Sequence, residues 1–136
     1  MLLSPNFYHD QESSKKAISQ IQEFLDDFPN SEYSKDADKL INELRTRLAE
    51  KNMETGKLYV KLKAYDSAIV SYKIVVNEFY DTKFFNDANM EIIRCLALQK
   101  KSDEAKQFLT DLEVNEKSVV TDSFKEQALS VIKDNS

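Results

Sequence analysis

Residues 26–40 read DDFPNSEYSKDADKL, and fifty-one residues later the chain repeats the pattern as NEFYDTKFFNDANME (77–91). The paired positions are Phe28 and Phe79, Asn30 and Asp81, Ser31 and Thr82, Tyr33 and Phe84, Asp36 and Asp87, and Ala37 and Ala88. An echo in this order indicates an internal repeat. Pro29 disfavours a helical conformation at the residue before it, and Ser34 is a suitable cap for a new helix. Each stretch is therefore predicted to be a junction between two helices.

The scarcity of turn residues points to the fold class. One glycine and two prolines occur in 136 residues. Sheet proteins need many turn residues, so this shortage favours long helices joined by few loops. The length suits one domain, and we expect a single helical-repeat domain over residues 1–136.

Charge and composition argue against several classes of function. The net charge of −5 provides no general attraction for nucleic acid or for an anionic membrane surface. A single cysteine excludes an internal disulfide and a cysteine-based metal cluster. No apolar run approaches the roughly 20 residues that span a bilayer, and MLLSPNFYHD does not resemble a signal peptide. We expect no cofactor, no metal and no nucleic acid partner.

Apolar residues recur at helical spacing along most of the chain. They predict helices from Ser13 or Ser14 to Phe28, from Ser34 to about Leu62, after KLKAY, after DTK, from Ser102, and from about Thr121 to Lys133. On this basis residues 1–12 form an N-terminal loop. Residues 13–112 hold about two and a half to three repeats, and residues 113–136 hold a C-terminal helix that either caps the array or contacts a partner.

One unit of the chain fits the tetratricopeptide pattern of small and aromatic positions. Gly56, Tyr59, Ala68 and Tyr72 occupy successive small, aromatic, small and aromatic positions. Small residues let two helices approach closely, so we expect Gly56 to be buried at a helix contact. The pattern predicts an all-α, tetratricopeptide-type α-solenoid of antiparallel helix pairs, with one long helix shared between repeats.

Three strings narrow the family further: FPNSEYSKDA (28–37), RLAEK (47–51) and KLKAYDSAI (61–69). Because of these strings and the spacing between them, the segment from about residue 10 to residue 112 resembles the C-terminal repeats of the BamD family of outer membrane assembly lipoproteins. The resemblance implies a scaffold at the periplasmic face of the outer membrane, held there by a lipidated N-terminal cysteine. Such a scaffold joins the soluble domains of the BamA barrel protein and other assembly subunits, and it helps to receive unfolded outer membrane proteins.

The sequence departs from that family in two respects. It has no lipobox cysteine, and the family's first two repeats have no counterpart here. The resemblance therefore implies the portion that the family uses chiefly to dock on BamA, with membrane attachment only through an anchor absent from this chain. The alternative is a general tetratricopeptide adaptor that holds an extended peptide in its concave groove.

No residue constellation predicts catalysis. His9 is the only histidine and has no nucleophile beside it, so a hydrolase using it is the least favoured class. Cys95 lies among apolar helix positions, which predicts an inert, semi-buried thiol. Asp103 and Glu104 stand at a helix start, where they interact with the helix dipole. We expect no enzymatic activity.

The candidate partner-binding residues are aromatic and basic. Tyr65, Tyr80 and Phe85 lie at turns or off the main apolar stripe, where they provide either a partner surface or junction packing. Lys57, Lys61 and Lys63 form a basic cluster that is either solvated or directed at an acidic partner. The other aromatics with core spacing are assigned to packing: Tyr59, Tyr72, Phe79, Phe84 and Phe108.

Overall fold

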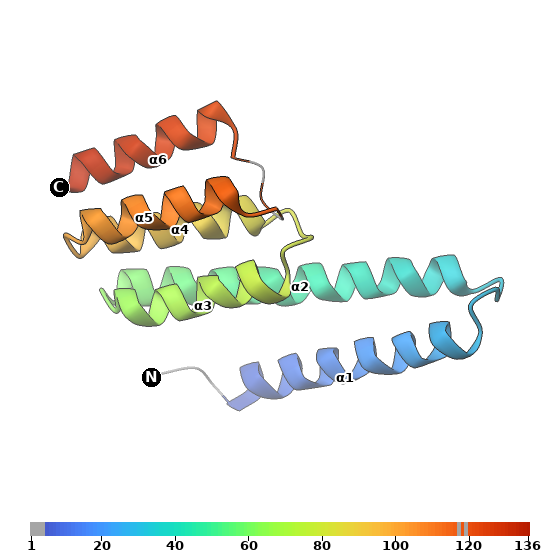
Figure 1. The fold of residues 1–136 in the computed structure, drawn as a ribbon. Helices are drawn as coiled ribbons and strands as arrows, with labels where there is room; N and C mark the ends of the chain where they lie inside the picture. The colour runs from blue at the N-terminus through green and yellow to red at the C-terminus, as the bar shows by residue number, and fades with distance from the viewer. Residues whose placement is uncertain (1–4, 117, 119) are drawn as a thin grey trace. The chain divides into compact units, whose positions relative to one another are not determined.

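The structure, a computed structural model, describes residues 5–116, 118 and 120–136, and the regular structure among them is entirely helical (Figure 1). The helices are α1 (Pro5–Asp27), α2 (Ser34–Lys61), α3 (Tyr65–Glu78), α4 (Phe85–Leu98), α5 (Ser102–Val114) and α6 (Asp122–Asn135). The predicted all-α fold of packed neighbouring helices is confirmed. The long second helix has 28 residues, as the uninterrupted apolar stripe predicts.

The N-terminal loop predicted over residues 1–12 is wrong for residues 5–12, because α1 already begins at Pro5. Residues 1–4 lie outside the described residues. Proline is well tolerated in the first turn of a helix, since the N–H that it lacks would have no helical acceptor there. Pro5 is therefore part of a helix start, and His9 lies in a helix.

The junction after α1 has the predicted position. The Phe28 N–H donates to the Phe24 carbonyl at 2.9 Å as the helix ends, and α2 begins at Ser34. The Ser34 hydroxyl donates back to the carbonyls of Phe28 and Pro29, at 3.4 and 3.3 Å. The serine thus ties its helix to the preceding turn through donated hydrogen bonds, whereas a typical N-cap side chain accepts them.

The second junction repeats two backbone hydrogen bonds of the first, one in the turn and one at the start of the following helix. In the first junction, the N–H of Ser31 donates to the Phe28 carbonyl and the N–H of Ala37 donates to the Tyr33 carbonyl. In the second junction, the N–H of Thr82 donates to the Phe79 carbonyl and the N–H of Ala88 donates to the Phe84 carbonyl. The distances agree as well, since both turn bonds measure 3.1 Å and both helix-start bonds measure 2.9 Å. The sequence echo over 51 residues is therefore also an echo in backbone geometry.

The chain divides into two compact units. The first ends at Leu48 and contains α1 with the N-terminal part of α2, and the second begins at Ala49 and contains the rest of α2 with α3–α6. That both units form one domain, as the sequence predicts, stays a prediction.

In the second unit, α4, α5 and α6 pack beside one another and share an apolar core (Figure 1). The buried members of this core are Met90, Ile93, Ala97, Ala105, Leu109, Leu112, Ala128, Val131 and Ile132. The helix α6 begins at a good N-cap, because the Thr121 hydroxyl accepts the N–H of Phe124 at 3.1 Å. That α6 closes the end of the array remains a prediction.

The contact between α2 and α3 depends on Gly56, as its sequence position predicts. A Cβ at this residue would lie 2.5 Å from Cε1 and Cζ of Tyr72, closer than side chains can approach. The Tyr72 side chain is fully buried. Glycine is therefore the residue that allows α2 to approach the ring of Tyr72 this closely.

Candidate functional site

The three lysines of the predicted basic cluster are all exposed at the C-terminal end of α2. Lys57 lies on the helix, Lys61 is its last residue, and Lys63 follows in the turn with a φ of 59°. Lys57 also lines a pocket of the second unit, with a volume of about 240 Å³. Of the three, Lys57 is the residue that the structure associates with a defined site.

The three predicted aromatic anchors have different environments. Tyr65 is the first residue of α3 and is half-buried, while Tyr80 is 42% exposed in the following junction. Phe85 is only 8% exposed, which favours junction packing over a partner surface for this residue. It is the first residue of α4 and shares that helix's buried face with Ala88 and Ile92, three and seven residues further on.

Phe84 is the aromatic residue of this junction that reaches the pocket. The sequence assigns it to the core, but it is only half-buried and contributes to the pocket wall. Helical spacing alone does not settle which of two adjacent aromatic residues faces the core, because α4 begins between them. Of the two rings, Phe85 is buried and Phe84 is the one that reaches the pocket.

The pocket lies among α2, α4 and α6, and we call it the α2–α4–α6 pocket. Its lining residues are Met53, Lys57, Phe84, Asp87, Met90, Glu91, Arg94 and Gln127. Met53 and Met90 are each 6% exposed and supply apolar surface beside Phe84. Small-molecule sites commonly have about 300–1,000 Å³, so this smaller volume suits one inserted side chain better than a whole ligand.

Charged groups of both signs surround this apolar surface. Lys57 and Arg94 are balanced by Asp87 and Glu91, and the Arg94 Nε lies 3.5 Å from the Glu91 Oε1. This ion pair is partly exposed, and such pairs are commonly worth about 0–1 kcal/mol, so a partner can displace it at little cost. The balance of charges suits a partner with both acidic and basic groups.

A third cation, Lys83, lies next to the pocket, where it contacts the ring of Phe84. The Lys83 Nζ is 5.3 Å from the centroid of the Phe84 ring, which is within the range of a cation–π interaction. This contact favours a ring orientation in which Phe84 is covered on one face. The Lys83 side chain thus covers one face of the aromatic wall of the pocket.

Behind this surface, Cys95 is fully buried. Burial, followed by the negative charge of Glu91, raises the pKa of its thiol to about 11. The same two causes raise the pKa of Tyr72 well above its usual value of 10. Both groups are therefore protonated at neutral pH, and the environment of Cys95 fits the prediction of an unreactive thiol.

The described residues contain no group of three or more histidine, cysteine or acidic side chains that could hold a metal ion. Among these same residues, no helix combines the length and apolar character needed to cross a membrane.

The sequence spacing of four residues could have predicted the α4 part of the pocket, but the residues selected from the sequence were aromatic and basic ones instead. Asp87, Met90, Glu91 and Arg94 follow one another within two turns of α4, and the spacings of three and four among them place them on one face. A charged stripe of this kind is usually taken as a solvated surface. It becomes a candidate site only because α2 and α6 contribute side chains beside it.

Comparison with known proteins relates most of the chain to one family. Residues 2–108 match the model of the YfiO family, described as outer membrane lipoprotein. Three proteins named outer membrane protein assembly factor BamD are each 27% identical to the chain. The match to the Rickettsia prowazekii protein covers 115 residues, which are 85% of this chain and 45% of that protein. The corresponding shares are 71% and 32% for Caulobacter vibrioides, and 74% and 43% for Vibrio cholerae. The chain thus spans less than half the length of these relatives.

Proposed function

The chain belongs to the YfiO family of outer membrane lipoproteins, and from that premise we propose that it is a non-enzymatic scaffold in outer membrane protein assembly. The observation that carries the proposal is the family match over residues 2–108, together with three relatives named for that assembly process. The helical-repeat fold supports it, because stacked helices offer extended surfaces to partners. In this role the chain works at the periplasmic face of the outer membrane.

The partner in this proposal is the periplasmic part of a BamA-type barrel assembly protein. Protein interfaces commonly combine an apolar centre with a polar rim, and aromatic and arginine side chains are frequent anchors. The α2–α4–α6 pocket has this composition, with Phe84 and Met90 in its wall and Lys57 and Arg94 among its charged residues. It is accordingly the docking site that we assign to the partner.

The direct test is a binding measurement between the purified chain and the periplasmic domains of BamA from the same bacterium. Biolayer interferometry should detect a complex with a Kd on the order of 10 μM or tighter. The absence of binding at several times that concentration would show that this chain does not dock on BamA by itself.

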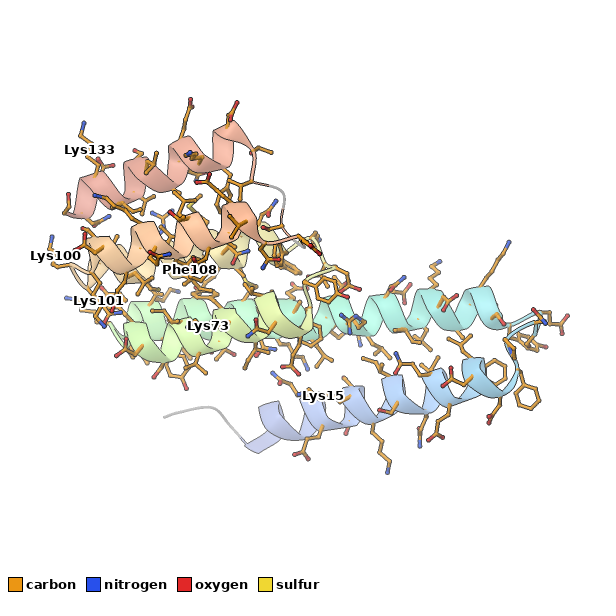
Figure 2. The ribbon with its side chains drawn as sticks, in the orientation of Figure 1. Lys15, Lys73, Lys100, Lys101, Phe108 and Lys133 are labelled. Carbon is orange, nitrogen blue, oxygen red and sulfur yellow. The ribbon has the colours of Figure 1, made fainter. Side chains whose placement is uncertain are left out.

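Variants of the pocket test where the partner binds. Reversing two charges with Lys57→Glu and Arg94→Glu, or removing the aromatic wall with Phe84→Ala, should weaken binding about tenfold. The matched controls are Lys73→Glu on α3 and Lys106→Glu on α5, two exposed lysines on helices outside the pocket lining (Figure 2 shows Lys73). Equal losses in the control variants would remove the pocket from the proposal, while leaving the partner in place.

A second candidate is a tetratricopeptide adaptor for an extended peptide. It is favoured by the size of the pocket, since about 240 Å³ is enough for one side chain of a peptide that runs past it. Unfolded peptides covering the BamA periplasmic domains distinguish the two candidates. Peptides that bind as tightly as the folded domains support the adaptor, and binding to the folded domains alone supports the scaffold.

A further inference from the structure

Two of the chain's three methionines lie in the wall of the α2–α4–α6 pocket. Met53 comes from α2 and Met90 from α4, while Met1 lies outside the described residues. Methionine is rare in this sequence, so its presence on both helices gives this one pocket an unusual thioether surface. The docking role proposed for the pocket involves these two side chains only as apolar surface and leaves their sulfur chemistry unused.

Both methionines border a space that a small molecule can enter. Each is 6% exposed, and the pocket has a volume of about 240 Å³, whereas roughly 10–15 Å³ is enough to admit a water molecule. Hydrogen peroxide is little larger than water, so it can reach this wall in the folded chain. The other sulfur of the described residues belongs to Cys95, which is fully buried. Within the described part of the chain, the two thioethers are therefore the sulfur groups most open to an oxidant.

The pocket also supplies hydrogen-bond donors to the product of oxidation. A thioether sulfur is a weak acceptor, whereas the oxygen of a sulfoxide is polar and needs a donor when it is buried. Lys57, Arg94 and Gln127 line the same pocket and carry ammonium, guanidinium and amide donors. The 3.5 Å ion pair between Arg94 and Glu91 is partly exposed, so the guanidinium can turn toward a new acceptor at little cost. A sulfoxide formed here accordingly has donors beside it, as it would not in a closed apolar core.

We propose that Met53 and Met90 form a modification site at which a peroxide oxidises the thioethers to sulfoxides in the folded chain. A sulfur lone pair attacks one oxygen of hydrogen peroxide, and the O–O bond breaks as the S–O bond forms. The departing hydroxide takes the proton of the transferred oxygen and leaves as water. The sulfur loses two electrons and the peroxide gains them. Enzymes that reduce methionine sulfoxide restore the thioether, so the modification is reversible.

Oxidation changes what the pocket can hold. A sulfoxide places a polar oxygen where the unmodified methionines present apolar surface beside Phe84. A partner side chain seated against this wall would cover that oxygen and displace its hydrogen-bond donors, which costs binding free energy. The loss of docking on oxidation therefore rests on the proposed function, whereas the modification itself does not.

Peptide mass spectrometry of the full chain after timed exposure to hydrogen peroxide tests the modification site. Met53 and Met90 should each gain one oxygen atom while circular dichroism still records a folded chain. A methionine that reacts only after global unfolding is protected more than about a thousandfold, so the native rates should lie within about tenfold of those in urea. Native rates below this range would show that folding closes the site and would overturn the proposal.

Binding to the BamA periplasmic domains, measured before and after oxidation, tests the consequence for docking. The oxidised chain should bind at least about fivefold more weakly, and treatment with methionine sulfoxide reductases A and B should restore the affinity. The matched control is the double variant Met53→Leu, Met90→Leu, because leucine has a similar volume and no oxidisable sulfur. Whatever its starting affinity, this variant should keep it after peroxide. It retains Cys95, so it also controls for damage elsewhere in the chain.

Two binding results would overturn the consequence for docking. They are an unchanged affinity of the oxidised chain and an equal loss of affinity in the oxidised double leucine variant. If the unmodified chain does not bind the BamA domains at all, the proposed function fails. The mass spectrometry still decides in that case whether the two methionines form a modification site.

Discussion

Gly56 shows how one residue sets the spacing of two helices. Two effects of opposite sign compete in a Gly56→Ala variant. Alanine is favoured over glycine inside a helix by about 1 kcal/mol, but its methyl group would meet the ring of Tyr72 at 2.5 Å. The ring is fully buried, so its movement is restricted, and the steric cost should exceed the gain in helix propensity.

We therefore expect Gly56→Ala to lower the free energy of unfolding by about 1–3 kcal/mol, the usual cost of overpacking. Urea denaturation followed by circular dichroism measures the change. Glu54→Ala, at an exposed position two residues earlier on α2, is the control and should have a small effect. In a chain that already carries Tyr72→Leu, Gly56→Ala should cost less than it does in the native chain, and an equal cost in both would place the strain elsewhere.

The raised pKa of Cys95 leads to a separate prediction about how the stability of the chain depends on pH. Its folded pKa is about 11, compared with an ordinary value of 9. Between these values the unfolded thiol has lost its proton while the folded thiol keeps it, so the unfolded state is favoured as the pH rises. The stability of the native chain should fall between about pH 9 and pH 11 more steeply than that of Cys95→Ala, as urea titrations at each pH would measure. Parallel pH profiles would show that the thiol does not contribute.

The turns between paired helices share an uncommon backbone conformation. Lys63 and Lys100 have φ values of 59° and 63°, and each stands five residues before the alanine of its repeat, Ala68 or Ala105. This left-handed conformation is unfavourable for residues with a Cβ, and glycine is the usual choice after the end of a helix. Lysine is present at both turns despite this strain.

Replacing Lys63 with glycine should therefore raise the free energy of unfolding, by about 0.5–1 kcal/mol. The gain at Lys100 (labelled in Figure 2) should be smaller. Its Nζ donates a 2.8 Å hydrogen bond to the carbonyl of Asn135, the last residue of α6, and the glycine variant would lose this bond. Thermal unfolding of both variants measures the difference. A larger gain for Lys100→Gly than for Lys63→Gly would contradict this ranking.

Over the whole molecule, burial is uneven between the two units. In the described part of the first unit, the buried apolar side chains are Ile41 and Leu48, while the second unit buries a continuous set from α2 to α6. Local opening requires less free energy where few apolar contacts are lost.

Hydrogen exchange measured by mass spectrometry should therefore show faster exchange in α1 than in α4. The comparison is made within one sample, so solution conditions are the same for both helices. Equal protection of α1 and α4 would contradict the expected order of stability.

Local signals predicted much of this architecture because they depend on neighbouring residues alone. Pro29 and Ser34 mark the first junction, and the apolar stripe between Ser34 and Leu62 predicts one long helix, which ends at Lys61. The start of α1 was missed because proline is compatible with both a loop and the first turn of a helix. The small residue at Gly56 predicted a close helix contact but did not identify Tyr72 as the side chain it meets.

The candidate site was less predictable, because its members come from separate helices. Lys57 was identified as a basic residue, but Arg94 and Gln127 join it only once α2, α4 and α6 are packed. The different burial of Phe84 and Phe85 has the same origin, since a rotation of about 100° per residue decides which ring is buried. Periodicity, capping and the 51-residue echo were enough to predict a helical-repeat protein, and its resemblance to one family came from three short strings, FPNSEYSKDA, RLAEK and KLKAYDSAI. Which side chains share a pocket, and which ring of the second junction is buried, depended on helix packing, because contacts between distant segments are absent from any local pattern.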